Sequence, residues 1–237
     1  MLNLFVTGTG KGKNLVTAGL AITMQSLGYA TGVYVPVQCG AVVKNGFIHS
    51  PDLVFIKNMD ENIKTYCSYL FKSHDLPLIS AAAEGQKIDK DVIYEDFNSI
   101  NDKFECLLTN GTNGIATPLG VDFLEIDLVK TLNLPLLLTI SPSVSAVSDI
   151  LIMINHAVVK NVEMRGVIIN DCPLKTDNEN IKNLPKLIEK YTDTRILGVL
   201  PAIENPAYIS AGDLISHVLA GVNLESIFNI RIAKLHG

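Results

Sequence analysis

The stretch FVTGTGKGKNLVTAGLA, residues 5–21, runs from an apolar segment through a loop of glycines and lysines into a helical pattern. This order favours an anion site, because the free N–H groups and the positive dipole end of a helix start both face the loop. A lysine in such a loop reaches the outer phosphates of a nucleotide. We predict that Lys13 is catalytic and that the phosphate contacts are Gly8, Thr9, Gly10, Lys11, Gly12, Lys13 and Asn14.

The loop departs from the usual pattern GxxxxGK[ST] in two ways. It is one spacer residue short, and Asn14 stands where a hydroxyl residue would bind Mg²⁺. The amide oxygen of Asn is a poorer ligand for Mg²⁺ than a hard anionic oxygen. A short Gly/Lys turn at a strand–helix junction also has a purely structural interpretation, in which Lys13 is a solvated residue at a helix start. On the loop alone, both interpretations stay open.

Short apolar runs alternate with helical periods along most of the chain. Such alternation is typical of right-handed strand–helix–strand crossovers, which build a parallel sheet with helices on both faces. We expect one domain, residues 1–237, with three α/β/α layers and a mainly parallel central sheet. Strands are expected at residues 3–7, 29–37, 105–109, 135–140, 165–170 and 195–200, and helices at residues 15–27, 123–132, 144–159 and 178–191. Residues 41–104 are less regular and are expected to hold helices after Pro51, near residues 78–85 and near residues 89–98.

Several expected strands end in small or turn-forming residues. Gly8, Asn110, Ser141 and Asn170 each lie at such an end. The carboxyl ends of parallel strands meet at one edge of the sheet, where ligands of open α/β folds bind. We therefore expect these residues to lie at a ligand site, although Asn170 also has an interpretation as a plain turn residue.

Composition excludes several classes of function. The net charge of −5 provides no basic stripe to neutralise nucleic-acid phosphates, so no nucleic-acid partner is expected. No run of about 18 apolar residues occurs, so no membrane span is expected. The four cysteines show no CxxC spacing, which predicts free thiols in a reducing, cytoplasmic compartment.

Further motifs follow in order along nearly the whole chain, and together they resemble the dethiobiotin synthetase family. The opening is similar to that family's FVTGTDTxVGKT, and YVPVQCG at residues 34–40 to its YKPVxSG. HSPD at residues 49–52 resembles xSxD, and LPLISAAAEGQKID at residues 76–89 resembles SPHLAAxxEGxxID. LTNGTNGIATPL at residues 108–119 sits where the family has VEGAGGxxxPL. GVIIND at residues 166–171 and GVLPAIENP at residues 198–206 resemble the segments that enclose the adenine.

The resemblance implies a P-loop NTPase-like fold and a ring closure that depends on ATP and Mg²⁺. In that family CO₂ converts 7,8-diaminononanoate into a carbamate, ATP phosphorylates the carbamate, and the second amine closes a ureido ring. The resemblance also implies a homodimer with sites near the subunit interface, and a small diamino carboxylic acid as substrate. The matching residues are Asn170, Pro201 and Asn205 for the nucleotide, Cys39 and Gly40 for the substrate, and Asp52, Asn14 and Asn110 for the metal.

A serine-rich stretch, residues 141–148, opens an expected helix. Free N–H groups at that helix start would bind a carboxylate, so we assign Ser145 and Ser148 to the substrate. Helix capping alone would explain the serines equally well. Asp52 has a comparable alternative as an acid that the dipole favours at a helix N-terminus. Cys39 is expected to be a small loop residue and no nucleophile, because no His lies near it in the motifs.

The chain departs from the family at positions that carry the chemistry. Val35 replaces the Lys of YKPV, Asn14 the metal-binding Thr, and Asn110 the metal-binding Glu. Losing one such electrostatic group typically costs about 10²–10³ in rate. Two interpretations follow: a slow dethiobiotin synthetase, in which Lys11 supplies a missing cation, or a non-catalytic relative. The relative would keep the fold and bind a nucleotide, another small anion or a protein partner. A ligase acting on another amine or carboxylate is a third interpretation, with no feature of its own in the sequence.

Overall fold

The opening stretch folds into strand β1 (Leu4–Thr9) and helix α1 (Lys13–Ser26), joined by the glycine-rich loop, in a computed structural model that describes residues 1–10 and 12–232. Lys11, predicted above as a phosphate contact, lies outside the described residues. Strand β1 lies at the centre of a sheet with the order β5-β2-β6-β1-β7-β8-β9, and all of its described pairs are parallel. The other strands are β2 (Thr31–Gln38), β5 (Lys64–Leu70), β6 (Cys106–Asn110), β7 (Leu136–Ile140), β8 (Met164–Cys172) and β9 (Ile196–Pro201).

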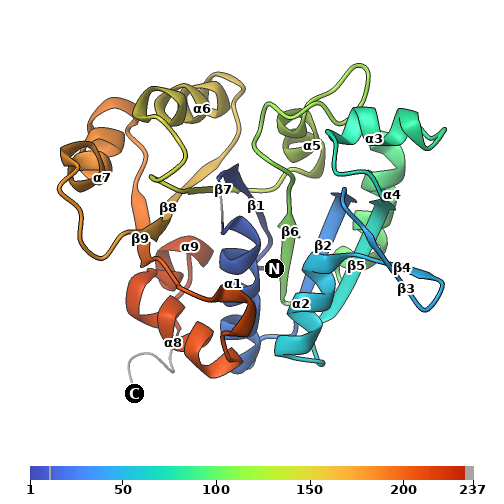
Figure 1. The fold of residues 1–237 in the computed structure, drawn as a ribbon, viewed down its shortest axis with the longest axis horizontal. Coiled ribbons are helices and arrows are strands. Elements are labelled where there is room, and N and C mark those ends of the chain that lie inside the picture. The colour runs from blue at the N-terminus through green and yellow to red at the C-terminus, as the bar shows by residue number, and fades with distance from the viewer. Residues whose placement is uncertain (11, 233–237) are drawn as a thin grey trace.

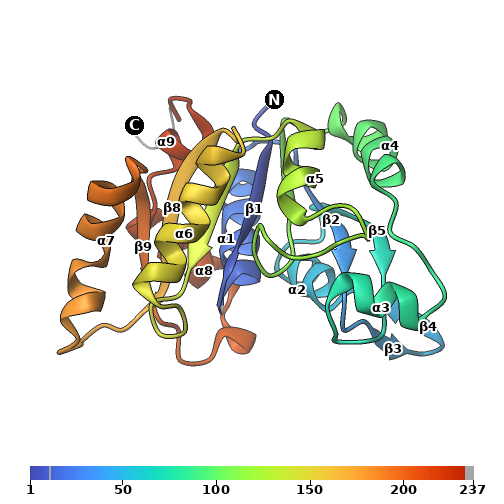
Figure 2. The ribbon, with the colours of Figure 1, turned by 90° about the horizontal axis from the view of Figure 1, so that it is seen from above.

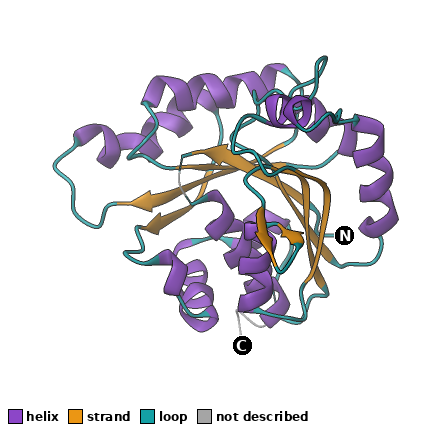
Figure 3. Cartoon of the chain, turned by 45° about the vertical axis from the view of Figure 1, so that its right-hand side comes forward, coloured by secondary structure: helices purple, strands orange, loops and turns teal. Residues whose placement is uncertain are grey.

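Helices cover both faces of this sheet (Figure 1, Figure 3). One face carries α1 together with α2 (Pro51–Met59), α8 (Ala211–Gly221) and α9 (Leu224–Phe228). The other face carries α3 (Pro77–Ala83), α4 (Lys90–Asn101), α5 (Glu125–Leu132), α6 (Val147–Val159) and α7 (Glu179–Thr192). Each helix layer packs its own apolar cluster against the sheet. The predicted three-layer α/β/α architecture is therefore confirmed.

Helix α1 is the most deeply enclosed of the helices that bear on the site. Ala18, Leu20 and Ala21 have no exposed surface. A Cβ on Gly19 would lie 2.7 Å from Val218 Cγ2, so α8 packs closely against α1 at this point. An all-round apolar helix of this kind is held by burial on several sides. Its N-terminus, which carries Lys13, is consequently fixed relative to the sheet.

The structure corrects the expected organisation of residues 41–104. This section contains a hairpin, β3 (Val42–Lys44) and β4 (Phe47–His49), and the edge strand β5 in addition to helices α2, α3 and α4. Asn45 and Gly46 form the hairpin turn with φ of 53° and 78°. Asn-Gly is the preferred dipeptide for a turn with two positive φ values, so the sequence held a usable signal here. Helices α8 and α9 were also not among the expected elements.

Parallel pairing places the carboxyl ends of all the sheet strands at one edge (Figure 2). The predicted meeting of Gly8, Asn110, Ser141 and Asn170 at a single edge is thereby confirmed. Most element boundaries differ from expectation by one to three residues; for example, α6 begins at Val147 and not at residue 144. Within the described part of the chain, no helix has both the length and the apolarity that a bilayer crossing requires.

Candidate functional site

The glycine-rich loop passes so close to neighbouring strands that three of its positions have no room for a side chain. A Cβ on Gly8 would lie 1.7 Å from the Thr139 carbonyl oxygen. Gly12 has φ of +96°, and its Cβ would lie 1.7 Å from Asn170 Nδ2. Gly10, with φ of +87°, would meet Val144 Cγ2 at 2.3 Å. The loop therefore lies directly against the ends of β7 and β8, and glycine is required by both conformation and space.

Lys13 does not extend into solvent as a residue at a helix start usually does. Its side chain is 8% exposed, and its ammonium donates hydrogen bonds to three oxygens. The acceptors are Asn14 Oδ1 at 2.7 Å, Asn110 Oδ1 at 2.7 Å and the Gly111 carbonyl oxygen at 2.6 Å. An ammonium group has three donors, so all three are satisfied by neutral oxygens of the protein. The interpretation of Lys13 as a solvated lysine is therefore wrong.

The amide groups around Lys13 are also connected to one another. Asn110 Nδ2 donates to Asn14 Oδ1 over 3.1 Å, and Thr17 Oγ1 donates to Asn110 Oδ1 over 3.0 Å. Thr17 was not predicted from the sequence; it lies one helical turn after Lys13 and donates to the Lys13 carbonyl oxygen as well. The network is thus complete without a ligand.

Burial lowers the pKa of Lys13 from 10.5 to about 8, and the carboxylates of Asp52 and Glu125 act in the opposite direction. Burial raises the pKa of Asp52, while Lys13 and a hydrogen bond with Gln38 lower it. These opposing effects are the expected result of placing one cation and two carboxylates in a poorly solvated site.

The three residues assigned to Mg²⁺ do not form a metal site by themselves. Asn14 and Asn110 direct their amide oxygens at the Lys13 ammonium, and Asp52 is the single carboxylate of the set. Among the described residues, no group of three His, Cys, Asp or Glu side chains is arranged to hold a metal. Mg²⁺ prefers anionic oxygens and phosphates, so the residues present do not fit a metal held by the protein alone.

Two cavities adjoin at this end of the sheet. The larger, of about 480 Å³, lies beside the loop and is lined by Gly12, Leu15, Phe55, Asp171, Ile203, Glu204, Pro206 and Ala207, as well as by Asn14, Asp52, Asn170 and Pro201. The smaller, of about 200 Å³, is lined by Lys13, Val35, Val37, Gln38, Cys39, His74, Asp75, Pro77, Gly111, Thr112 and Asn113, and again by Asn14 and Asp52. Since Asn14 and Asp52 line both, the two cavities meet next to Lys13.

Four of the ten residues predicted for the nucleotide come together at the larger cavity. Gly12, Asn14, Asn170 and Pro201 line it, although they come from α1, β8 and β9 and the loop before α1. Asn205 does not line it, although its neighbours Glu204 and Pro206 do. The three carboxylates on this cavity, from Asp52, Asp171 and Glu204, include two that the sequence analysis did not single out.

Cys39 lines the smaller cavity, and His74 lines the same cavity. His74 packs on Gly40, where a Cβ would lie 2.5 Å from His74 Nδ1. The loop after β5 thus brings a His, which the sequence motifs did not place near Cys39, back to the end of β2. Burial raises the pKa of the Cys39 thiol, which disfavours the reactive thiolate.

Ser145 and Ser148 line a different cavity of about 450 Å³ between α6 and α7, away from Lys13. Ser145 Oγ lies 2.9 Å from Thr9 Oγ1, which links this segment to the glycine-rich loop. Helix α6 begins after Ala146 and has no side-chain cap, so capping does not explain these serines. Ser141 and Ser143 instead donate to the Asp171 carboxylate over 3.2 and 3.1 Å.

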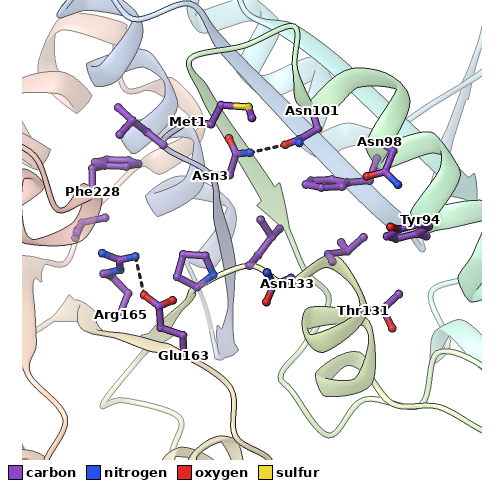
Figure 4. Close-up of a pocket in the computed structure, with 16 residues that line it drawn as sticks. Met1, Asn3, Tyr94, Asn98, Asn101, Thr131, Asn133, Glu163, Arg165 and Phe228 are labelled. Carbon is purple, nitrogen blue, oxygen red and sulfur yellow. Dashed lines mark hydrogen bonds and ion pairs between the residues drawn. The ribbon is translucent and has the colours of Figure 1, made fainter.

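A further cavity of about 460 Å³ lies at the opposite edge of the sheet, where the strands begin (Figure 4). Asn3, Asn98, Asn101 and Asn133 contribute amide groups to its wall, and Arg165 pairs with Glu163 beside it. None of the residues predicted from the sequence lines this cavity, so it is separate from the site around Lys13.

The site also contains a residue that the sequence analysis missed. Glu125, the first residue of α5, has no exposed surface and accepts hydrogen bonds from Thr7 and Thr112. An acid in the first turn of a helix normally indicates a favourable dipole interaction at the surface. No local pattern showed that this carboxylate would be enclosed beside the end of β6.

The chain is similar to known proteins over most of its length. A family model described as an AAA domain matches residues 2–207. ATP-dependent dethiobiotin synthetase BioD of Bacillus licheniformis is 29% identical over 210 residues, covering 86% of this chain and 88% of that protein. The protein of the same name from Bacillus subtilis strain 168 is 27% identical over 236 residues, covering 97% and 98%.

Among solved structures, the MinC:MinD cell division protein complex of Aquifex aeolicus includes a similar chain. It superposes with a TM-score of 0.54 at 14% identity, covering 99% of this chain and 96% of that one. At this identity the similarity concerns the fold alone, and it agrees with a P-loop NTPase-like sheet. The chain belongs to the AAA domain family and, within it, to the dethiobiotin synthetase family.

Proposed function

We propose that this protein catalyses ring closure of the dethiobiotin synthetase type, using ATP, CO₂ and 7,8-diaminononanoate. One observation carries the proposal: the two cavities meet next to Lys13, with Asn14 and Asp52 in the wall of both. A reaction between a nucleotide and a second molecule needs two such compartments with a cation at their junction.

The larger cavity has the volume and the lining that a nucleoside requires. Asn170 and Pro201 would contact the base, and Gly12 and Asn14 would lie on the side of the phosphates. ATP would supply the phosphoryl group for the carbamate. Lys13 would stabilise negative charge on the transferring group once its ammonium exchanges protein oxygens for phosphate oxygens.

The smaller cavity has a lining suited to a diamine. Val35 and Val37 offer apolar contact to an alkyl chain, while Asp52 and Asp75 offer carboxylates to amino groups. Val35 also removes a cation that the resemblance implies at this position, so we expect slow turnover. We further propose that the protein is a cytoplasmic homodimer and that Ser145 and Ser148 contact the substrate carboxylate across the subunit interface.

A second function is a non-catalytic relative that binds a nucleotide, another small anion or a protein partner. The observation that favours it is the closed network of Lys13 with Asn14, Asn110 and Gly111. A phosphate must displace at least one of these oxygens, and among the described residues no group of three His, Cys, Asp or Glu side chains is arranged to hold a metal. In this second function the protein keeps the fold and the two cavities but catalyses no reaction.

The test is product formation at high enzyme concentration with diaminononanoate, ¹³C-bicarbonate, ATP and Mg²⁺, followed by mass spectrometry. We expect slow incorporation of ¹³C into a ureido product, lost in Lys13→Met and retained in Lys182→Met, which removes a surface lysine paired with Glu179. A variant that combines Asn14→Thr, Val35→Lys and Asn110→Glu should raise the rate. No product from the native protein, together with ATP binding in a calorimeter, would establish the non-catalytic function instead.

A further inference from the structure

Glu125 is a fully buried carboxylate that the proposed reaction does not use directly. Its Oε1 accepts a hydrogen bond from Thr7 Oγ1, on the strand that leads into the glycine-rich loop. Its Oε2 accepts from the backbone N–H and the hydroxyl of Thr112, in the loop that follows β6. The carboxylate thus joins the two segments that lie on either side of Lys13.

The contact with Lys13 passes through a single peptide group. The carbonyl oxygen of Gly111 accepts from the Lys13 ammonium over 2.6 Å, and the N–H of the same peptide, at Thr112, donates to Glu125. The peptide therefore lies between the Lys13 ammonium on its oxygen side and a Glu125 carboxyl oxygen on its hydrogen side. Both hydrogen bonds favour the same orientation of the peptide, and the bond from the ammonium is of the stronger, charge-assisted kind.

The surroundings leave Glu125 little freedom to do anything else. A Cβ on Gly111 would lie 2.9 Å from Glu125 Oε1, so the carboxylate packs directly on this backbone. The backbone N–H of Glu125 donates to the Thr117 carbonyl oxygen over 2.9 Å, and that of Ile126 to Ile115 over 2.9 Å. The N-terminus of α5 is thereby hydrogen-bonded to the loop after β6, and Glu125, its first residue, also contacts that loop through Thr112.

We propose that Glu125 is a positioning residue for Lys13: it fixes the orientation of the peptide between Gly111 and Thr112, and this peptide holds the Lys13 ammonium at the junction of the two cavities. Without the carboxylate, the peptide loses the acceptor for its N–H, and Lys13 loses the acceptor that is fixed most rigidly. The consequence for turnover rests on the proposed function, whereas the placement of Lys13 does not.

The chain offers a matched control on the same helix turn. Asp127 is also an acid in the first turn of α5, and its carboxylate accepts from the Leu124 N–H over 2.9 Å. Glu125→Met and Asp127→Leu each replace a carboxylate on the same helix turn by an apolar group of similar size, which removes the acceptor oxygens. Only Glu125 contacts the peptide that holds Lys13.

The first experiment needs neither ligand nor turnover. Each protein is treated briefly with acetic anhydride, and acetylation of Lys13 is measured by mass spectrometry relative to the surface residue Lys182. We expect Glu125→Met to increase Lys13 labelling several-fold and Asp127→Leu to leave it unchanged. Equal labelling of Lys13 in native and folded Glu125→Met protein would overturn the proposal.

A second variant and a turnover assay extend this test. If Glu125→Met does not fold, Glu125→Asp withdraws the carboxylate from the Thr112 N–H by one methylene, and an increase in labelling is expected; no increase would overturn the proposal. In the turnover assay, Glu125→Met should lower kcat about 10- to 100-fold with little change in KM for ATP, and should add nothing in a Lys13→Met background. Absence of turnover in the native protein would contradict the proposed function, while the labelling result would still decide the role of Glu125.

Discussion

The Lys13 ammonium donates a 2.7 Å hydrogen bond to the amide oxygen of Asn110 at the end of β6. The same amide oxygen accepts from Thr17, and the amide nitrogen donates to Asn14. A neutral side chain therefore occupies the place where the family resemblance implies a metal-binding carboxylate. Lys13 gains hydrogen bonds there but no compensating charge from this partner, and burial lowers its pKa.

Anion binding should weaken as the pH rises above about 8. Burial lowers the pKa of Lys13 to about 8, so the ammonium loses its proton in a range where most lysines stay charged. Calorimetric titration of ATP at a series of pH values between about 7 and 9 should show this loss. Binding that persists unchanged across this range would contradict a role for the Lys13 charge.

Replacing Asn110 by Asp should move that transition to higher pH. An anionic partner at the 2.7 Å contact favours the charged form of Lys13 and raises its pKa. Asn113→Asp is a suitable control, because Asn113 lines the smaller cavity but is not one of the three residues that accept hydrogen bonds from the Lys13 ammonium. The same titration series, run on both variants, should show a shift in the first and a much smaller one in the second.

The free energy of unfolding should depend on the protonation of Lys13 between about pH 8 and pH 10.5. The folded protein releases the Lys13 proton near pH 8, whereas the unfolded chain does so near 10.5. The unfolded chain thus binds more protons in this window, and the free energy of unfolding should rise with pH across it. A shift of this size corresponds to about 3 kcal/mol, which charged Lys13 costs the fold at neutral pH.

Denaturant unfolding of native and Lys13→Met protein, compared at several pH values, isolates this effect. Tyr34, whose pKa burial raises, is present in both proteins and so cancels in the difference. The free energy of unfolding of Lys13→Met, relative to that of the native protein, should be highest at neutral pH and should decrease until about pH 10.5. A difference independent of pH would show that burial of the charge has no energetic consequence.

Gly12→Ala should lower stability and ATP binding more than Gly46→Ala does. Gly12→Ala meets both a positive φ of +96° and Asn170 Nδ2 at 1.7 Å. Gly46→Ala meets a positive φ of +78° with open space around it. The strain of the left-handed conformation alone costs roughly 1–2 kcal/mol, so the difference between the two variants reports the clash.

Thermal unfolding and ATP titration would measure this pair of variants. We expect Gly12→Ala to lose ATP binding and to unfold at a clearly lower temperature than Gly46→Ala. Equal behaviour would mean that the loop can move away from β8, and that the close approach of Gly12 to Asn170 is not required.

Much of the sheet could be predicted because its signals are local. The apolar runs at Leu136–Ile140 and Cys106–Asn110 are buried throughout, so composition alone marks them as central strands. Edge strand β5 is half-buried and includes polar residues between Lys64 and Leu70, which weakens the same signal. Helices α8 and α9 depend on packing against α1 and β9, which no local pattern encodes.

The candidate site was predictable where a motif fixes the backbone and not where side chains meet from distant segments. Gly12, Asn14, Asn170 and Pro201 were assigned to the nucleotide and line one cavity. The state of Lys13, in contrast, depends on Asn110, Gly111 and Glu125, which lie about a hundred residues away in the chain. Such contacts arise from strand order, and sequence spacing does not show them.

The hydrogen bonds that the Lys13 ammonium makes within the protein also have a consequence for how this family diverges. Because Asn14, Asn110 and Gly111 accept hydrogen bonds from its ammonium, removing the lysine would leave buried oxygens without this donor, whether or not a substrate ever arrives. This cost opposes the cost of burying the charge, so the lysine can be retained after selection for turnover has relaxed. Among homologous sequences, retention of this lysine is thus a poor marker of activity, and the residues that surround it are the better ones to compare.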